Sequence, residues 1–177
     1  MAAQKGKAGG GSLTRSEVVT IRLTPRLRYL VEIAARSQRR TVSNYIECAI
    51  ESSLKGVRLA GGDGILDGPT MTLAQQADRL WNVHESSRFL YLALLFPWLL
   101  VHREQLLWQL IKDRGLTTGL ELDGSEFNIG DDWVHLFDYQ KIEDYVLPQL
   151  KEHWDAFNKV VDGELPEDSL PDWKDSA

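Results

Sequence analysis

The side chains most suited to catalytic or metal chemistry are one cysteine, four histidines and a few pairs of neighbouring carboxylates. The histidines are widely spaced, at His84, His102, His135 and His153. No two of them have the separation that places two metal ligands on one face of a helix. Cys48 has no second cysteine to support it, so a small buried thiol is expected. We therefore expect no metal site and no cofactor, and a lone cysteine fits a reducing cytoplasm.

Adjacent carboxylates occur at Asp131-Asp132 and Glu143-Asp144. Such pairs can act as general acid and base, but no nucleophile accompanies them, and runs of carboxylates are common on exposed surfaces. The sequence also lacks the Gly-x-Gly-x-x-Gly, Walker and Gly-x-Ser-x-Gly patterns. We therefore expect that the protein is not an enzyme.

Basic side chains gather at the N-terminal end of the chain. Residues 1–58 have a net charge of +7, and residues 59–177 have a net charge of −13, so the overall value of −6 conceals a basic segment. Such a division suggests an end that faces nucleic acid joined to an acidic domain. Residues 1–16 form a Gly- and Lys-rich stretch that we expect to be a disordered basic tail.

The residues from Val18 to Leu23 alternate in polarity as a strand does. One face holds Val19, Ile21 and Leu23, and the other holds Val18, Thr20 and Arg22. A strand this short needs a partner for its backbone groups, and the same strand of a second chain would supply one. The resulting two-stranded ribbon would fit a DNA major groove, where Arg22 can bond guanine and Thr20 offers a hydroxyl and a methyl group.

Two short helices are expected after this strand. Thr24 and Pro25 suit the start of the first, which would run to about Gln38. Thr41 suits the cap of the second, which would end near Gly56, where glycine can supply a left-handed stop. The free N–H groups at the start of the second helix form an anion site next to the basic turn. The expected phosphate contacts are Arg15, Arg39, Arg40, Thr41, Val42 and Ser43.

Residues 17–54 resemble the ribbon-helix-helix family, the Arc/MetJ/CopG group of bacterial and phage repressors and antitoxins. The resemblance lies in Val-Val-Thr-Ile-Arg-Leu-Thr-Pro and in Arg-Thr-Val-Ser-Asn-Tyr-Ile. It implies an intertwined dimer in which Val18, Thr20 and Arg22 face bases and the start of the second helix touches phosphate. The dimer core would hold Val19, Ile21, Leu23, Leu30, Ala34, Ile46 and Ala49.

Two residues depart from the family pattern. Many members have a glycine in the turn between the helices, whereas this chain has Arg39, so the turn must be formed differently or be strained. Val18 is apolar at a position that would face the groove, which weakens base specificity there. The alternative interpretation of the whole segment is an ordinary strand and helical hairpin in a mixed domain.

The remaining two thirds of the chain predict an acidic helical domain over residues 71–162, joined by a Gly-rich linker over residues 57–70. Helices are expected from Thr72 to Phe96, from Trp98 to Arg114 with Gly115 as the stop, and from Asp138 to Val161. The apolar run from Phe89 to Val101 is too short to span a bilayer, so we expect a buried helix. Six tryptophans beyond Leu80 supply a core, and residues 163–177 form an acidic tail.

The expected fold class is therefore mainly α, with an N-terminal ribbon-helix-helix domain over residues 17–56 and a helical C-terminal domain. The favoured function is that of a cytoplasmic, nucleoid-associated repressor that binds double-stranded DNA as a homodimer or a higher even-numbered oligomer. In the alternative, an antitoxin-like protein neutralises a basic partner through its acidic C-terminal part. A weaker hypothesis keeps the N-terminal module as a dimeriser without affinity for DNA.

Overall fold

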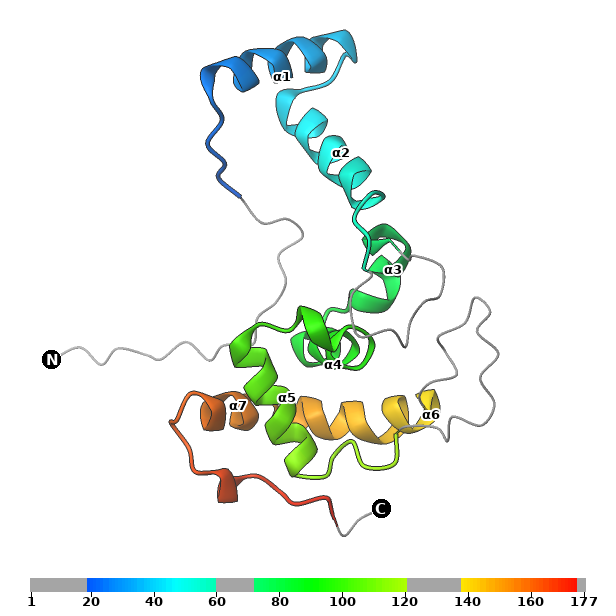
Figure 1. Cartoon of the computed structure of the whole chain (residues 1–177), viewed down its shortest axis with the longest axis vertical. Coiled ribbons are helices and arrows are strands. Elements are labelled where there is room, and N and C mark those ends of the chain that lie inside the picture. The colour runs from blue at the N-terminus through cyan, green and yellow to red at the C-terminus, as the bar shows by residue number, and fades with distance from the viewer. Residues whose placement is uncertain (1–18, 60–71, 121–137, 175–177) are drawn as a thin grey trace, which may run out of the picture. The chain divides into compact units, whose positions relative to one another are not determined.

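Figure 1 shows the protein as a computed structural model, which describes residues 19–59, 72–120 and 138–174. Helices dominate these residues. In chain order the elements are α1 (Pro25–Ser37), α2 (Val42–Leu54), α3 (Leu73–Leu80), α4 (Glu85–Leu95), the 3₁₀ turn η1 (Pro97–Leu99), α5 (His102–Asp113), α6 (Tyr139–Lys141), the π turn η4 (Ile142–Val146), α7 (Leu147–Val161) and the 3₁₀ turn η5 (Glu167–Ser169). The chain divides into two compact units, Met1–Ile50 and Glu51–Ala177.

Residues 19–23, the described part of the strand expected over residues 18–23, do not form a strand, so the prediction of a ribbon-helix-helix fold with a strand is wrong. Val18 lies outside the described residues, and residues 19–23 have no regular secondary structure. Their backbone makes no hydrogen bond within the described part of the chain. An alternating pattern forms a strand only where a second strand completes the ladder. The sole β pairing among the described residues is an isolated antiparallel bridge between Arg58 and Thr72.

The two helices expected after this segment are confirmed. α1 begins after Thr24, whose Oγ1 accepts a hydrogen bond from the Leu27 N–H at 3.3 Å, and Pro25 is its first residue. α2 begins after Thr41, whose Oγ1 accepts from the Asn44 N–H at 3.2 Å. These bonds satisfy N–H groups that a helix start leaves unpaired. The expected left-handed stop at Gly56 is wrong, since Gly56 does not have a positive φ.

The helix expected from Thr72 to Phe96 is divided into α3 and α4. Thr72 and Gln75 form a capping box at the start of α3. Between the two helices the Asn82 Oδ1 accepts a hydrogen bond from the His84 N–H at 2.9 Å. Asparagine commonly competes for backbone N–H groups in this way, and the turn it forms interrupts the apolar pattern.

The next helix also starts later than expected. Residues 97–99 form the turn η1, and α5 begins at His102 instead of near Trp98. Its end agrees with the prediction, because Gly115 follows with φ 79°. A Cβ on Gly115 would also lie 2.8 Å from the Lys174 backbone nitrogen, so only glycine fits both the conformation and the close approach.

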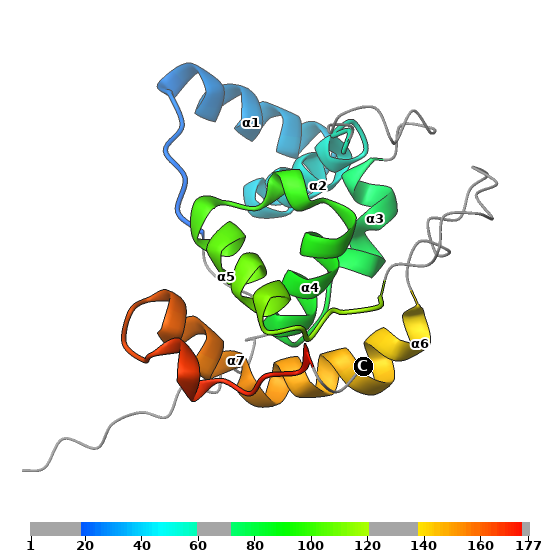
Figure 2. The ribbon, with the colours of Figure 1, turned by 60° about the horizontal axis from the view of Figure 1, so that its bottom comes forward.

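The core of the second unit lies where α4 and α5 pack on α7 (Figure 2). The Phe89 ring contacts the rings of Trp154 and Trp108, with centroid distances of 5.4 Å and 6.4 Å. Leu90 of α4 and Ile111 of α5 are fully buried in the same cluster. Burial of such side chains stabilises a domain by about 1.5–3 kcal/mol each. The apolar run from Phe89 therefore enters the core, and none of the described helices has the length and hydropathy needed to cross a bilayer.

A π turn allows α6 and α7 to continue as one rod, which appears in Figure 2 as the long yellow and orange helix. The Leu147 N–H bonds to the Ile142 carbonyl, five residues back. Pro148 follows, and it has no N–H and would crowd the carbonyl four residues earlier in a regular helix. The wider turn accommodates the proline ring. On this turn Glu143 accepts a hydrogen bond from the Tyr91 hydroxyl. The pKa of Tyr91 is raised above its ordinary value, mainly by burial of the hydroxyl and also by this hydrogen bond.

The described part of the expected acidic tail packs on the core. Trp173 is only 6% exposed, and its ring stacks on Phe157 with a centroid distance of 6.0 Å. The Trp173 N–H bonds to the Arg114 carbonyl at 2.8 Å, and the Arg114 guanidinium donates to the carbonyls of Glu167 and Leu170. The C-terminal segment is therefore a structural part of the second unit.

We predict that Trp173→Ala lowers the free energy of unfolding by about 3–5 kcal/mol, the usual loss for a large buried ring. Trp81→Ala is the matched control, because Trp81 is 61% exposed and its loss should cost less than about 1 kcal/mol. Denaturant unfolding followed by circular dichroism measures both. Equal losses in the two variants would contradict the role of the C-terminal segment.

Candidate nucleic-acid interface

The side chains expected to read bases are exposed at the start of the first unit. Thr20 and Arg22 are both accessible, and neither side chain has a hydrogen bond or ion pair within the described residues. Val18 and Arg15, the other predicted DNA contacts that precede α1 in sequence, lie outside the described residues. Arg22 is thus free to extend its guanidinium to a ligand.

Sequence analysis left two alternatives for the turn between α1 and α2, a different turn or a strained one at Arg39, and the structure has the strained one. Arg39 has φ 54° and is the only non-glycine residue with positive φ in the described part of the chain. Its N–H bonds to the Arg36 carbonyl at 3.0 Å, and the Arg40 N–H bonds to the Ala35 carbonyl at 2.9 Å. These two bonds form a Schellman motif, in which the left-handed position is usually glycine. A residue with a side chain costs about 1–2 kcal/mol there.

The start of α2 adjoins this turn and leaves amide groups available. The Asn44 N–H, which we expected to bind an anion, is occupied by Thr41 Oγ1. No acceptor contacts the Val42 and Ser43 N–H groups within the described residues. Both residues are exposed, so a phosphate oxygen could approach them.

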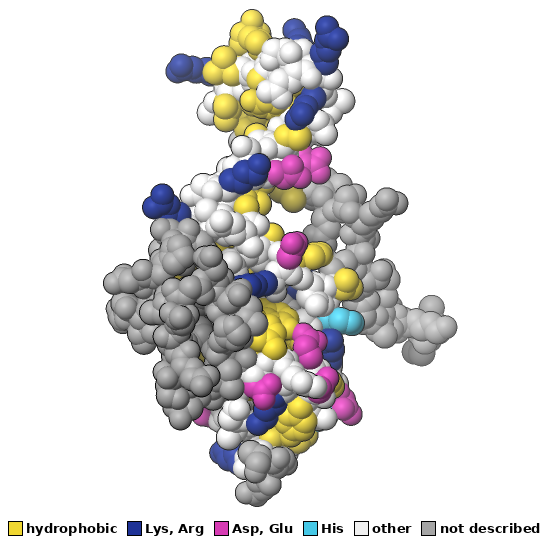
Figure 3. Space-filling model, turned by 90° about the vertical axis from the view of Figure 1, so that its right-hand side faces the viewer, with side chains coloured by type: hydrophobic (Ala, Val, Ile, Leu, Met, Phe, Trp, Pro, Cys, Tyr) yellow, Lys and Arg dark blue, Asp and Glu magenta, His cyan; other side chains and the backbone are white. Residues whose placement is uncertain are grey.

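The described arginines of the first unit fall into two groups. Glu32 pairs with Arg28 at 3.2 Å and lies 3.9 Å from Arg36. The side chains of the other group have no acidic partner within the described residues, and this group comprises Arg22, Arg26, Arg39 and Arg40. The exposed arginines appear as blue side chains on the hairpin at the top of Figure 3. The unpaired group gives the unit an uncompensated positive charge.

Sequence analysis did not assign a role to Arg26. The sequence itself indicates that Arg26 has no ion-pair partner along the helix, because the residue four positions later is Leu30, whereas Arg28 has Glu32 at that spacing. Charged side chains pair along a helix at this separation. Arg26 is also exposed, in the first turn of α1.

Four of the seven predicted dimer-core residues are exposed in this unit. Val19 is 80% exposed, Ile21 51% and Leu30 49%, and Ala49 is also exposed. Leu23, Ala34 and Ile46 are half-buried. Ala35 is the single buried residue of α1, and α2 has none. Yellow apolar side chains therefore lie beside the arginines on the surface of the hairpin (Figure 3).

The candidate catalytic residues are not assembled into a site among the described residues. No group of three or more metal-ligating side chains occurs there. His84, His102 and His153 lie in the second unit, His135 and the pair Asp131-Asp132 are outside the described residues, and Cys48 is half-buried on α2.

Comparison of the chain with protein-family models, curated proteins and solved structures found no match.

We predict that Arg39→Gly raises the free energy of unfolding of the helical hairpin by up to about 1 kcal/mol. Glycine removes the strain of the left-handed conformation, and part of this gain is offset because glycine makes the unfolded chain more flexible. Arg40→Gly is the control, since Arg40 has no positive φ and should lose stability instead. Circular dichroism melting of the two variants tests the difference. A loss of stability in both would contradict the strain at Arg39.

Proposed function

We propose that the protein is a DNA-binding transcriptional regulator, acting as a repressor, whose first unit contacts duplex DNA as a dimer. Thr20 and Arg22 contact base edges, with Val18 beside them. Arg39, Arg40 and the start of α2 contact phosphates. This division follows from chemistry, since base edges carry sequence information and phosphates supply affinity.

The observation that supports this proposal most strongly is the strained, unpaired arginine at the turn. Glycine would fit φ 54° without strain, yet an arginine stands there with its side chain exposed. Strained conformations persist where the surrounding structure holds them, and they cluster at binding sites. Arg40 follows directly, so two arginines stand in the turn that precedes the free amides of Val42 and Ser43. This combination suits a phosphate group.

The exposed apolar side chains support association with a second copy. Exposed aliphatic side chains such as Val19, Ile21 and Leu30 leave apolar area in water that a partner would remove. A second copy would cover it with the same residues, as a two-fold interface requires. Such a dimer would present two copies of Arg22 to DNA, and its operator would be palindromic or repeated.

The second unit fits a role in oligomerisation, ligand sensing or partner docking. Its described residues fold around a core that includes Phe89, Trp154 and Phe157. The antitoxin-like alternative is less favoured, because segments that bind a toxin are commonly disordered until the partner is present.

We expect Arg22→Ala to lower affinity for a selected operator by about 1–3 kcal/mol and to relax base preference, the usual worth of a bidentate base contact. Thr20→Ala should act in the same direction but less. Arg28→Ala is the matched control, because Arg28 is engaged by Glu32. Duplexes selected from a random pool by the unmodified protein, followed by gel-shift titration, provide the measurement. Unchanged discrimination by Arg22→Ala would rule out its base contact.

Phosphate contacts should behave differently. We expect Arg40→Ala and Arg39→Gly to weaken binding to all duplexes alike and to reduce the salt slope by about 1 for each contact removed. Arg39→Gly would then combine a more stable fold with weaker binding. Arg36→Ala, which removes a guanidinium 3.9 Å from Glu32, is the control and should leave the slope nearly unchanged. Titrations at several salt concentrations measure the slope, and equal slopes in all four proteins would exclude the phosphate contacts.

A further inference from the structure

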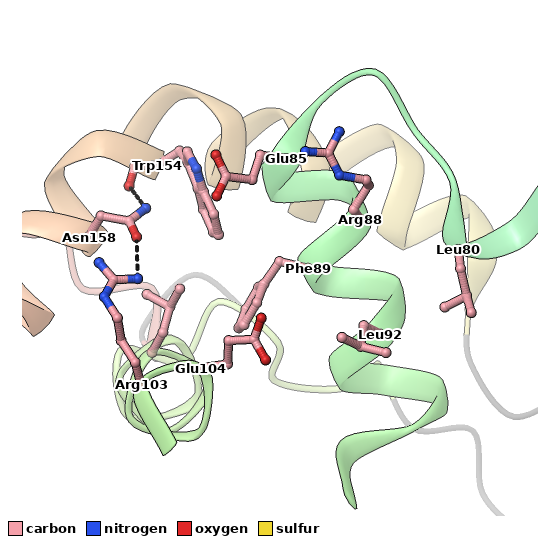
Figure 4. Close-up of a pocket in the computed structure, with 10 residues that line it drawn as sticks. Leu80, Glu85, Arg88, Phe89, Leu92, Arg103, Glu104, Trp154 and Asn158 are labelled. Atoms are coloured by element: carbon pink, nitrogen blue, oxygen red, sulfur yellow. Dashed lines mark hydrogen bonds between the residues drawn. The ribbon is translucent and has the colours of Figure 1, made fainter. Parts of the chain in front are cut away.

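The second unit has a pocket of about 350 Å³ between α4, α5 and α7, near the end of α3 (Figure 4). Its lining combines aliphatic and aromatic side chains with two arginines and two glutamates. The volume is near the lower end of the range for sites that bind small molecules. All the residues that form it belong to the second unit.

Apolar side chains form much of the lining. Phe89 and Leu107 are buried, and Trp154 lies against Phe89 with the two ring planes inclined at 48°. Leu80 and Leu92 lie away from Arg103 in Figure 4 and extend the apolar surface in that direction. This lining suits an aliphatic or aromatic group of modest size.

A guanidinium is held in place at the end of the pocket near α7. Arg103 Nε and Nη2 donate to the two carboxylate oxygens of Asp162 at 2.9 Å and 2.8 Å, and Nη1 donates to Asn158 Oδ1 at 3.0 Å. Asn158 is itself fixed by its bond to the Trp154 carbonyl at 2.8 Å. The arginine keeps N–H groups that these bonds do not use, because a guanidinium has five. It also holds the pKa of Asp162 below its usual value through the hydrogen bond between them.

Two carboxylates line the same pocket. Glu104 accepts a hydrogen bond from the Val101 N–H at 2.9 Å through Oε2, and no bond to its Oε1 occurs within the described residues. Glu85 has no hydrogen bond or ion pair there. Figure 4 shows Glu85 beside Trp154 and Glu104 beside Phe89. Acceptors for a positively charged group therefore line the same pocket as the aromatic rings, which also favour cations.

We propose that this pocket binds a small zwitterion with an apolar side chain, that is, a free apolar α-amino acid. Its carboxylate would bond to Arg103, its ammonium group to Glu85 and Glu104, and its side chain would lie on Phe89 toward Leu92. Glu85 and Arg103 are exposed and Glu104 is half-buried, so a ligand can reach their charged groups from solvent. Charges of both signs beside an apolar lining are complementary to a molecule that carries both charges and an apolar group. A ligand with only one charge would bond either to Arg103 or to Glu85 and Glu104, but not to both.

Calorimetric titration of the full chain with L-phenylalanine and L-leucine tests the proposal. Phenethylamine, which lacks the carboxylate, and 3-phenylpropionate, which lacks the ammonium group, are the comparison ligands. We expect L-phenylalanine to bind at least about tenfold more tightly than either, since one such charged contact is worth that factor or more. Binding is measured without DNA, so a failure of the proposed DNA-binding function would leave this result unaffected.

Glu85→Gln supplies the specific variant. It should weaken L-phenylalanine about tenfold and leave 3-phenylpropionate unchanged, because only the contact to the ammonium group is lost. Glu152→Gln is the control, an exposed glutamate of α7 outside the pocket, and it should bind like the unmodified chain. Circular dichroism checks that both variants are folded. The proposal is overturned if neither amino acid binds, if either comparison ligand binds as tightly, or if the two variants bind L-phenylalanine equally well.

Discussion

Burial of aromatic side chains where α4 and α5 meet α7 is the interaction on which the second unit depends. Phe89 contacts two tryptophans from other helices, and Phe157 stacks on Trp173 from the C-terminal segment. Removal of these rings from water positions helices that are far apart in sequence. The π turn before Pro148, the helix stop at Gly115 and the hydrogen bonds of Arg114 hold the backbone in the course that this packing requires.

The first unit lacks such a centre, and this contrast underlies its proposed role. Its described helices bury little besides Ala35, so aliphatic side chains such as Val19 and Ile21 remain in water. A helical hairpin of this size gains too little from burial to be stable alone. The described part of the same unit carries guanidinium groups, those of Arg22, Arg26, Arg39 and Arg40, that have no carboxylate partner among the described residues. Apolar surface and free positive charge together favour a partner that covers the first and a polyanion that neutralises the second.

Local sequence was sufficient where the cause of a structure lies within one or two turns. The caps at Thr24 and Thr41 and the stop at Gly115 were predicted, because each depends on hydrogen bonds or sterics among neighbouring residues. An unusual turn was expected at Arg39, with strain as one of two alternatives, and the structure has the strain. The strand over residues 18–23 was not found, because an alternating pattern describes a surface but does not supply the partner strand that a ladder requires.

Contacts between residues that are far apart in the chain could not be predicted from the amino-acid sequence. Sequence patterns indicated helices on both sides of Pro97 and along residues 138–161, but not the break at Asn82 or the widened turn before Pro148. They gave no sign that Trp173 would stack on Phe157, or that Arg103, Glu85 and Glu104 would line one pocket with Trp154. Helix starts and stops follow from local propensity and capping. The packing of helices depends on side-chain shapes that meet only after the chain has folded back on itself.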